Sequence, residues 1–174
     1  MRGKTAAMNR PAFSATLPLP SEEDTAALAG RIGALAGAGD VLLLSGPIGA
    51  GKTHFARALI RARLAAHGLD EDIPSPTFTL VQSYEAGELE IWHADLYRLT
   101  HPDEVIELGL IDAFESALCL VEWPDRLGEL SPPTALRLDF AALPGGGHRV
   151  TLSGDAAWAA RLAGIVKDFT HAQP

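Results

Sequence analysis

The sequence has a single cysteine, no long apolar run and no excess of basic residues. Cys119 alone excludes an internal disulfide and a cysteine-based zinc site. No apolar segment approaches the roughly 20 residues of a transmembrane helix, so no contact with a membrane is expected. With 14 basic residues against 22 acidic ones and a net charge of -8, the chain lacks the basic face that independent nucleic-acid binding normally needs.

The start of the chain also lacks an apolar segment that would indicate a secretory signal, so the protein is predicted to be cytoplasmic. Residues 1–12 are expected to form a flexible N-terminal tail. A chain of 174 residues with 47% hydrophobic content has enough material for one core. Because no long linker interrupts the chain, residues 13–174 are predicted to form a single domain.

Strand and helix patterns alternate along the chain, which is typical of an α/β fold. The first strand, Phe13–Leu17, is expected to end at Pro18, and Ser21–Asp24 matches a capping box that starts a helix. Gly145–Gly147 separates two alternating segments that predict a hairpin. The remaining patterns predict strands over 41–44, 77–81, 118–121, 136–140 and 149–152, a further strand within 89–99 that has Asp95 toward its carboxyl end, and helices from 52 to about 67, from 102 to 109 and over 156–169.

The segment Gly46–Thr53 carries a phosphate-binding pattern. The apolar residues Val41–Leu44 predict a buried strand before it, and a helical periodicity follows it. Four residues separate the first glycine from Gly51-Lys52-Thr53, which is the spacing of a P-loop. Glycines allow several backbone N–H groups to point at one anion, and the helix N-terminus adds positive potential. Lys52 is expected to reach the phosphates of a nucleoside triphosphate, and Thr53 the magnesium that accompanies them.

Two other interpretations of these glycines fit less well. A plain glycine-rich turn does not explain the Lys-Thr pair or both flanking elements. A dinucleotide fingerprint has the order G-x-G-x-x-G, whereas the glycines here fall as G-x-x-G-x-G.

Two carboxylates come at the ends of predicted strands. Asp95 ends one strand and Glu122 directly follows the apolar run Leu118–Val121. Because ligands of open α/β sheets bind at the carboxyl ends of strands, both are expected beside the nucleotide. Glu122 stands where a Walker-B carboxylate holds magnesium. Asp95 is interpreted as an indirect magnesium ligand or as a group that orients water. The structural alternative for Asp95 is a cap or an ion pair with Arg98. His93 is interpreted as structural, because magnesium prefers oxygen ligands.

The residues alone leave the segment Ser75-Pro76-Thr77 open. It is either a plain turn or a switch loop that senses the γ-phosphate, as many nucleoside triphosphatases have after the P-loop helix.

Four motifs together resemble the bacterial TsaE family, from about Pro20 to Trp158. They are Gly46-Pro-Ile-Gly-Ala-Gly-Lys-Thr53, Ser75-Pro-Thr-Phe-Thr-Leu80, His93-Ala-Asp-Leu-Tyr-Arg-Leu99 and Val121-Glu-Trp-Pro124. The first is shared by a very large superfamily, but all four in this order in one small domain are specific. The resemblance implies a three-layer P-loop fold of the α/β class, with a mostly parallel sheet and a C-terminal antiparallel hairpin.

The resemblance also implies a function. TsaE is the ATPase of the machinery that makes threonylcarbamoyladenosine at adenosine 37 of tRNA, and it acts with the pair TsaB and TsaD. This chain is therefore expected to be a magnesium-dependent ATPase that is slow alone and activated by such partners, and to meet tRNA only indirectly, through the complex. Its expected cofactors are ATP and Mg²⁺.

The resemblance further implies site residues. Magnesium is expected on Thr53 and Glu122, and the catalytic groups are Lys52, Thr77, Asp95 and Glu122. Thr77 belongs to the Ser75–Thr77 loop, for which the resemblance favours a switch. Nucleotide contacts are expected from Glu22, Gly46, Pro47, Ile48, Gly49, Ala50, Gly51, Lys52, Thr53, His54, Asp95 and Arg149.

Two residues depart from the family's pattern. The family often has Asp where this chain has Pro47, and Thr where it has His54. His54 has no hydroxyl for the α-phosphate, although its backbone N–H remains available.

Two other function classes use the same loop. A small-molecule kinase needs an acceptor site and usually a closing lid, and no arginine-rich lid insertion is present. A regulatory GTPase needs a guanine-reading Asn/Thr-Lys-x-Asp motif, but Asn9 is the sole asparagine and no Thr-Lys-x-Asp occurs. The kinase is therefore the alternative that we keep.

Overall fold

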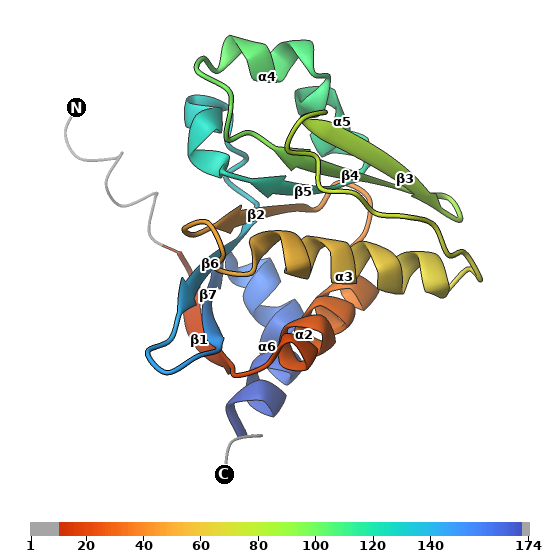
Figure 1. Ribbon diagram of the computed structural model, residues 1–174. Helices are drawn as coiled ribbons and strands as arrows, with labels where there is room; N and C mark the ends of the chain where they lie inside the picture. The colour runs from red at the N-terminus through yellow and green to blue at the C-terminus, as the bar shows by residue number, and fades with distance from the viewer. Residues whose placement is uncertain (1–10, 172–174) are drawn as a thin grey trace, which may run out of the picture.

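The computed structural model describes residues 11–171, which form one seven-stranded sheet with helices on both faces. The strand order is β1-β7-β6-β2-β5-β4-β3 (Figure 1). The N-terminal tail predicted over 1–12 lies mostly outside the described residues. No helix among residues 11–171 is long and apolar enough to cross a membrane.

The elements follow the alternation that the sequence predicts. The strands are β1 (Phe13–Leu19), β2 (Val41–Ser45), β3 (Val81–Ala86), β4 (Leu89–Asp95), β5 (Leu118–Glu122), β6 (Leu136–Ala142) and β7 (His148–Gly154). The helices are α2 (Glu22–Leu35), α3 (Lys52–Ala65), α4 (Asp103–Glu107), α5 (Leu110–Ser116), η1 (Pro124–Leu130, a 3₁₀ helix) and α6 (Ala156–His171). The predicted capping box is present, since the Ser21 side chain accepts a hydrogen bond from Asp24 N–H and the Asp24 side chain accepts one from Ser21 N–H.

The middle of the sheet is parallel and its two edges are antiparallel. Strand β2 pairs in parallel with β5 and β6, and β5 pairs in parallel with β4. The hairpin β6–β7 with β1 forms one antiparallel edge, and β3–β4 forms the other. The predicted fold class is confirmed. Because β2, β4 and β5 run in the same direction, their last residues Ser45, Asp95 and Glu122 meet at one edge of the sheet.

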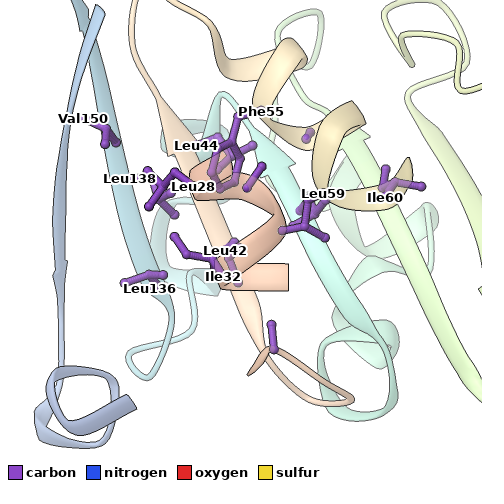
Figure 2. Packing of buried hydrophobic residues seen from close by; sticks show 14 of the residues in the cluster. Leu28, Ile32, Leu42, Leu44, Phe55, Leu59, Ile60, Leu136, Leu138 and Val150 are labelled. Atoms are coloured by element: carbon purple, nitrogen blue, oxygen red, sulfur yellow. The ribbon is translucent and has the colours of Figure 1, made fainter. Parts of the chain in front are cut away.

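Alternate residues of the central strands enter two separate cores. In β2, Leu42 and Leu44 pack toward α2, α3 and α6, whereas Val41 and Leu43 pack toward α4, α5 and η1. Figure 2 shows Leu42 and Leu44 in the larger core, which also contains Leu28, Phe55 and Leu138. A strand that is buried on both faces reads as a continuous apolar run, which explains the four apolar residues before the glycine loop.

Two predicted strand limits are wrong. Strand β1 continues through Pro18 to Leu19, because it pairs only with β7 at the edge of the sheet, where a proline is tolerated. The strand predicted over Thr77–Val81 begins only at Val81. Residues 76–79 form a turn that the Leu80 N–H closes on the Pro76 carbonyl (2.7 Å), with φ +69° at Leu80. β-branched residues favour a strand only where a partner strand is available, and the pairing of β3 with β4 starts at Val81.

Cys119 is a core residue, and its thiol is expected to be inert in the folded protein. It is fully buried in β5, and burial, followed by the negative charge of Glu90, raises its pKa from 9.0 to about 12. Because thiolates and not thiols react, a thiol reagent such as DTNB at pH 8 should label Cys119 only after unfolding in urea. Rapid labelling of the native chain would contradict this placement.

The same pKa gives a pH effect of known sign. A group whose pKa is higher in the folded state stabilises the fold below its unfolded pKa, and this contribution disappears as the pH rises toward the folded value. The free energy of unfolding should therefore fall between about pH 9 and pH 12 more steeply in the parental chain than in Cys119→Ala, in which this titration is absent.

Candidate functional site

A pocket of about 340 Å³ opens at the edge of the sheet where β2, β4 and β5 end. Its walls come from the glycine loop, the start of α3, the segments that follow β4 and β5, and the turn before β3. The lining residues are Ile48, Gly49, Gly51, Lys52, Thr53, Thr77, Asp95, Tyr97, Glu122 and Trp123.

The glycine loop takes a backbone course that other residues rarely adopt. Gly46, Gly49 and Gly51 have φ values of +138°, +82° and +105°. A Cβ built on Gly46 would lie 2.5 Å from the carbonyl oxygen of Phe140 in the neighbouring strand β6. Gly46 is therefore required both for its dihedral angle and for the close approach of the loop to the sheet.

Helix α3 begins at Lys52, at the end of this loop, and the N–H groups of its first turn have no acceptor within the helix. Its N-cap is Gly51, and no side chain within residues 11–171 caps it. The first turn contains no acidic residue, so the positive N-terminal end of a 14-residue helix is not neutralised there. This is the arrangement that binds a phosphate group.

Lys52 is the cation of the pocket. It is 5% exposed, its Nζ donates a hydrogen bond to the Gly46 carbonyl, and the same atom lies 3.6 Å from the ring centroid of Trp123. Burial lowers the pKa of Lys52, although Glu122, Asp95 and Asp125 oppose this shift by their negative charge. A buried ammonium with these partners can exchange the Gly46 carbonyl for a phosphate oxygen.

Glu122 is held at both carboxylate oxygens. The Thr53 hydroxyl donates to Glu122 Oε1 (2.6 Å), and His93 Nε2 lies 2.7 Å from Glu122 Oε2. Glu122 and His93 are 1% and 0% exposed. Thr53 and Glu122 are 69 positions apart in sequence, and the parallel pairing of β2 with β5 brings them together.

Asp95 connects the end of β4 to the turn before β3. Its Oδ1 accepts a hydrogen bond from Tyr97 N–H (3.0 Å), which closes the turn after the strand. Its Oδ2 faces the Thr77 hydroxyl at 3.5 Å, and Thr77 is also hydrogen-bonded to Ser75 (2.8 Å). Asp95 therefore has a structural role and also places one oxygen toward the pocket.

An aromatic pair forms part of the pocket wall. The rings of Tyr97 and Trp123 lie 4.8 Å apart at an interplanar angle of 52°. Trp123 follows Glu122 with φ +58°, an uncommon value for a residue with a large side chain. This backbone conformation turns the indole back over Lys52.

The residues present fit a magnesium-bound nucleoside triphosphate. Three glycines with positive φ and an uncapped helix N-terminus suit phosphate oxygens. The Thr53 hydroxyl and the Glu122 carboxylate are side by side and supply the oxygen ligands that magnesium prefers.

Comparison with known proteins agrees with this geometry. The family model described as "Threonylcarbamoyl adenosine biosynthesis protein TsaE" matches residues 19–149. This span is most of the chain and contains every residue that lines the pocket. The chain belongs to the TsaE family.

Individual relatives in the TsaE family carry the name tRNA threonylcarbamoyladenosine biosynthesis protein TsaE. The Rickettsia conorii protein is 40% identical over 125 residues, which cover 72% of this chain and 70% of that protein. The Bacillus subtilis protein is 38% identical over 117 residues, covering 67% of this chain and 70% of its own length. A crystal structure of Bacillus subtilis YdiB superposes with a TM-score of 0.71 and 26% identity, covering 89% of this chain and 95% of that one.

The structure brings most of the predicted TsaE-type site residues together. Lys52, Thr53, Thr77, Asp95 and Glu122 line one pocket with Ile48, Gly49 and Gly51. The loop residues Gly46, Pro47 and Ala50, and His54 in the first turn of α3, do not line this pocket. Their contacts with a nucleotide stay a prediction.

Two residues predicted to contact the nucleotide, Glu22 and Arg149, do not line this pocket, and their contacts with a nucleotide stay a prediction. Glu22 begins α2, with its carbonyl oxygen 3.1 Å from His54 Nε2, and Arg149 lies exposed in β7. The preceding residue, His148, instead reaches the glycine loop, with Nε2 3.1 Å from the Gly49 carbonyl. His148 and Arg149 are neighbours in β7, and neighbouring side chains of a strand point to opposite faces of the sheet. The side chain of His148 therefore contacts the glycine loop, and that of Arg149 points to the other face.

Sequence reasoning gave Tyr97 no place in the pocket and treated His93 as structural only. Both stand two residues from Asp95, on either side of it. Residues at a spacing of two share a face of a strand, so the position of His93 was an available signal. The contact between His93 and Glu122 could not be found in the same way, because it depends on the pairing of β4 with β5.

Gly46 offers a test of the loop geometry with a matched control. Gly46→Ala should lower the free energy of unfolding by at least about 2 kcal/mol more than Gly49→Ala, because both residues have positive φ but only Gly46 faces backbone atoms. Urea denaturation of the two variants measures the difference. Equal stabilities would show that the approach of Gly46 to Phe140 is not required.

Proposed function

We propose that this chain is the ATP-binding and ATP-hydrolysing component of tRNA threonylcarbamoyladenosine biosynthesis, acting on the modification of adenosine 37 together with a TsaB–TsaD-like pair of proteins. The observation that carries the proposal is the convergence of Lys52, Thr53, Asp95 and Glu122 on one pocket beside the glycine loop. Its family membership and the names of its relatives support the pathway.

In this proposal the loop holds the phosphates. The N–H groups of Gly46–Thr53 would donate to phosphate oxygens, and Lys52 would exchange the Gly46 carbonyl for the β- and γ-phosphates. The ammonium is already in place, because it is buried and, within residues 11–171, its hydrogen bond goes to the Gly46 carbonyl. Ordered donors of this kind require little reorganisation when the charge of the phosphates develops during reaction.

Thr53 and Glu122 would hold the magnesium, directly or through water. When bound, the ion offsets the negative charge of the phosphates and polarises the γ-phosphate. Asp95 lies within reach of the same region through Oδ2, where it would orient the attacking water or a magnesium-bound one. The aromatic pair Tyr97–Trp123, which lines the pocket, would limit the access of bulk water to it.

The surrounding charge supports a division of labour with partners. The net charge of -8 disfavours direct binding of tRNA, so the tRNA would be held by other members of the complex. Threonylcarbamoyl transfer would take place on those partners, and this chain would supply ATP turnover.

Titration calorimetry with ATP and magnesium tests the binding site. Lys52→Ala should weaken ATP binding roughly tenfold to a hundredfold, since it removes a charge-assisted contact worth about 1.5–3 kcal/mol. Lys167→Ala is the matched control, because Lys167 is exposed on α6, far from the pocket in sequence and on another element. Unchanged affinity in Lys52→Ala would contradict the P-loop assignment.

The fate of the γ-phosphate separates hydrolysis from the alternative, a small-molecule kinase. If the protein is an ATPase, the γ-phosphate is transferred to water and is released as inorganic phosphate. Transfer of a labelled γ-phosphate to a metabolite would favour the kinase instead, and preferential binding of GTP would favour a regulatory GTPase.

A further inference from the structure

His93 is a buried polar residue to which the proposed chemistry gives no task. It is 0% exposed in β4, where it pairs in register with Leu120 of β5. Its Nε2 lies 2.7 Å from Glu122 Oε2, and its Nδ1 is buried and has no hydrogen-bond partner among the described residues. The Glu122 contact is thus the one polar contact that fixes the imidazole within residues 11–171.

The geometry argues against His93 as a direct metal ligand. The nitrogen that faces the site is occupied by Glu122, and the other one points into protein with no exposed surface. Magnesium also prefers oxygen ligands. A ring of this kind can act on the site only through the carboxylate that it contacts.

We propose that His93 is a positioning residue for Glu122, which rests on the proposed function of Glu122 as a magnesium ligand. An ionised carboxylate only accepts hydrogen bonds, so His93 donates from Nε2 to Oε2 while Thr53 donates to Oε1. His93 approaches from the buried side and Thr53 from the side of the glycine loop. With Oε2 held by His93, Glu122 would be kept in the orientation that places Oε1 beside Thr53, where the two residues would hold the metal.

This fixation matters because a glutamate side chain is otherwise loosely held. The terminal torsion of glutamate has a broad distribution, so the carboxylate of an unrestrained Glu122 would sample a wide range of orientations with similar energies. Groups that hydrogen-bond metal ligands typically change metal affinity or activity by about 10–100-fold when they are removed. His93 would supply this restraint without touching the ion or the nucleotide.

Two substitutions separate the donor from the bulk of the side chain. His93→Leu keeps an apolar side chain of similar size but has no donor. His93→Gln places its amide nitrogen near the position of Nε2 and keeps the donor. The measurement is the affinity for a non-hydrolysable ATP analogue by calorimetry, with saturating Mg²⁺ and again with EDTA.

The expected result concerns the ratio of these two affinities, which is the enhancement by magnesium. His93→Leu should reduce the enhancement by roughly tenfold or more, with the affinity in EDTA close to the parental value, and His93→Gln should restore it. If His93→Leu and His93→Gln reduce the enhancement by magnesium equally, or if His93→Leu leaves it unchanged, the positioning role is overturned. If His93→Leu fails to fold, His93→Asn replaces it, because the shorter side chain keeps an amide but cannot reach Oε2.

A double variant tests whether His93 acts through Glu122. In Glu122→Gln, which has lost the charged ligand, adding His93→Leu should change the magnesium enhancement no further. Independent losses that multiply would show that His93 acts by another route, and they would overturn the proposal.

A stability measurement without nucleotide distinguishes failure of this inference from failure of the proposed function. If magnesium does not enhance binding in the parental chain, the metal role of Glu122 fails, and the pairing is then judged from stability without nucleotide. His93→Leu leaves a buried carboxylate with one donor fewer, so its urea midpoint should fall, and the double variant His93→Leu/Glu122→Leu should regain part of the loss. A double variant no more stable than His93→Leu would overturn the inferred pair.

Discussion

Glu122→Gln is expected to lower ATP turnover by roughly a hundredfold to a thousandfold, which corresponds to about 2.7–4 kcal/mol of lost transition-state stabilisation. The substitution keeps the shape of the side chain and its contact with Thr53, but removes the charge that offsets magnesium. Nucleotide affinity in EDTA should change much less, because the glycine loop and Lys52 remain. The measurement is steady-state phosphate release at saturating ATP and magnesium.

Glu129→Gln is the matched control for this variant, since Glu129 is exposed in η1 and does not line the pocket. Asp95→Asn should also damage turnover. Magnesium dependence that survives in Asp95→Asn would assign Asp95 to the orientation of water, and its loss would assign Asp95 to the metal. If Glu122→Gln and Asp95→Asn both turn over ATP at the parental rate, neither carboxylate has the proposed role.

Adding a TsaB–TsaD pair is expected to raise ATP turnover by about 10³-fold or more. A missing transition-state charge or an unordered switch slows P-loop enzymes by a factor of this size. No arginine is among the residues lining the pocket within residues 11–171. Two arginines near it are engaged elsewhere, with Arg98 over the Phe78 ring (5.7 Å) and Arg126 donating to the Tyr97 carbonyl (3.3 Å). A partner would therefore have to supply charge or order the Ser75–Thr77 loop.

Thr77→Ala should weaken this activation more than it alters nucleotide affinity. Thr77 faces Asp95 and lines the pocket, so a partner that orders the loop would act through it. Thr79→Ala is the control on the same turn, because the Thr79 hydroxyl is exposed and accepts a hydrogen bond from Gln82. If the pair neither binds this chain nor changes its rate, the proposed partnership fails, although the nucleotide site would remain.

The parts of the site that a local pattern encodes could be predicted from the sequence. The glycine loop needs only the eight residues Gly46–Thr53 between a strand and a helix, and Glu122 follows a doubly buried strand whose apolar run is visible in the sequence. The sheet edge that joins them follows from parallel strands, which the alternation of strands and helices indicates.

Contacts that depend on strand pairing or on backbone strain could not be predicted in the same way. The His93–Glu122 contact requires the register of β4 against β5. The positive φ values of Leu80 and Trp123 are unusual for such residues, so propensity favours a strand at Leu80 and gives no reason to place the Trp123 indole over Lys52. The contact of His148 with the Gly49 carbonyl likewise depends on how β7 pairs within the hairpin, and the nucleotide contact that the resemblance implies for Arg149 stays a prediction.

The most direct test of the central claim follows the γ-phosphate of labelled ATP in the presence of the purified chain, the partner pair and magnesium. The proposed function predicts release of labelled inorganic phosphate that requires magnesium, rises when the pair is added and is nearly lost in Glu122→Gln. Absence of release by the parental chain with the pair and magnesium, or the same release from Glu122→Gln, would contradict it.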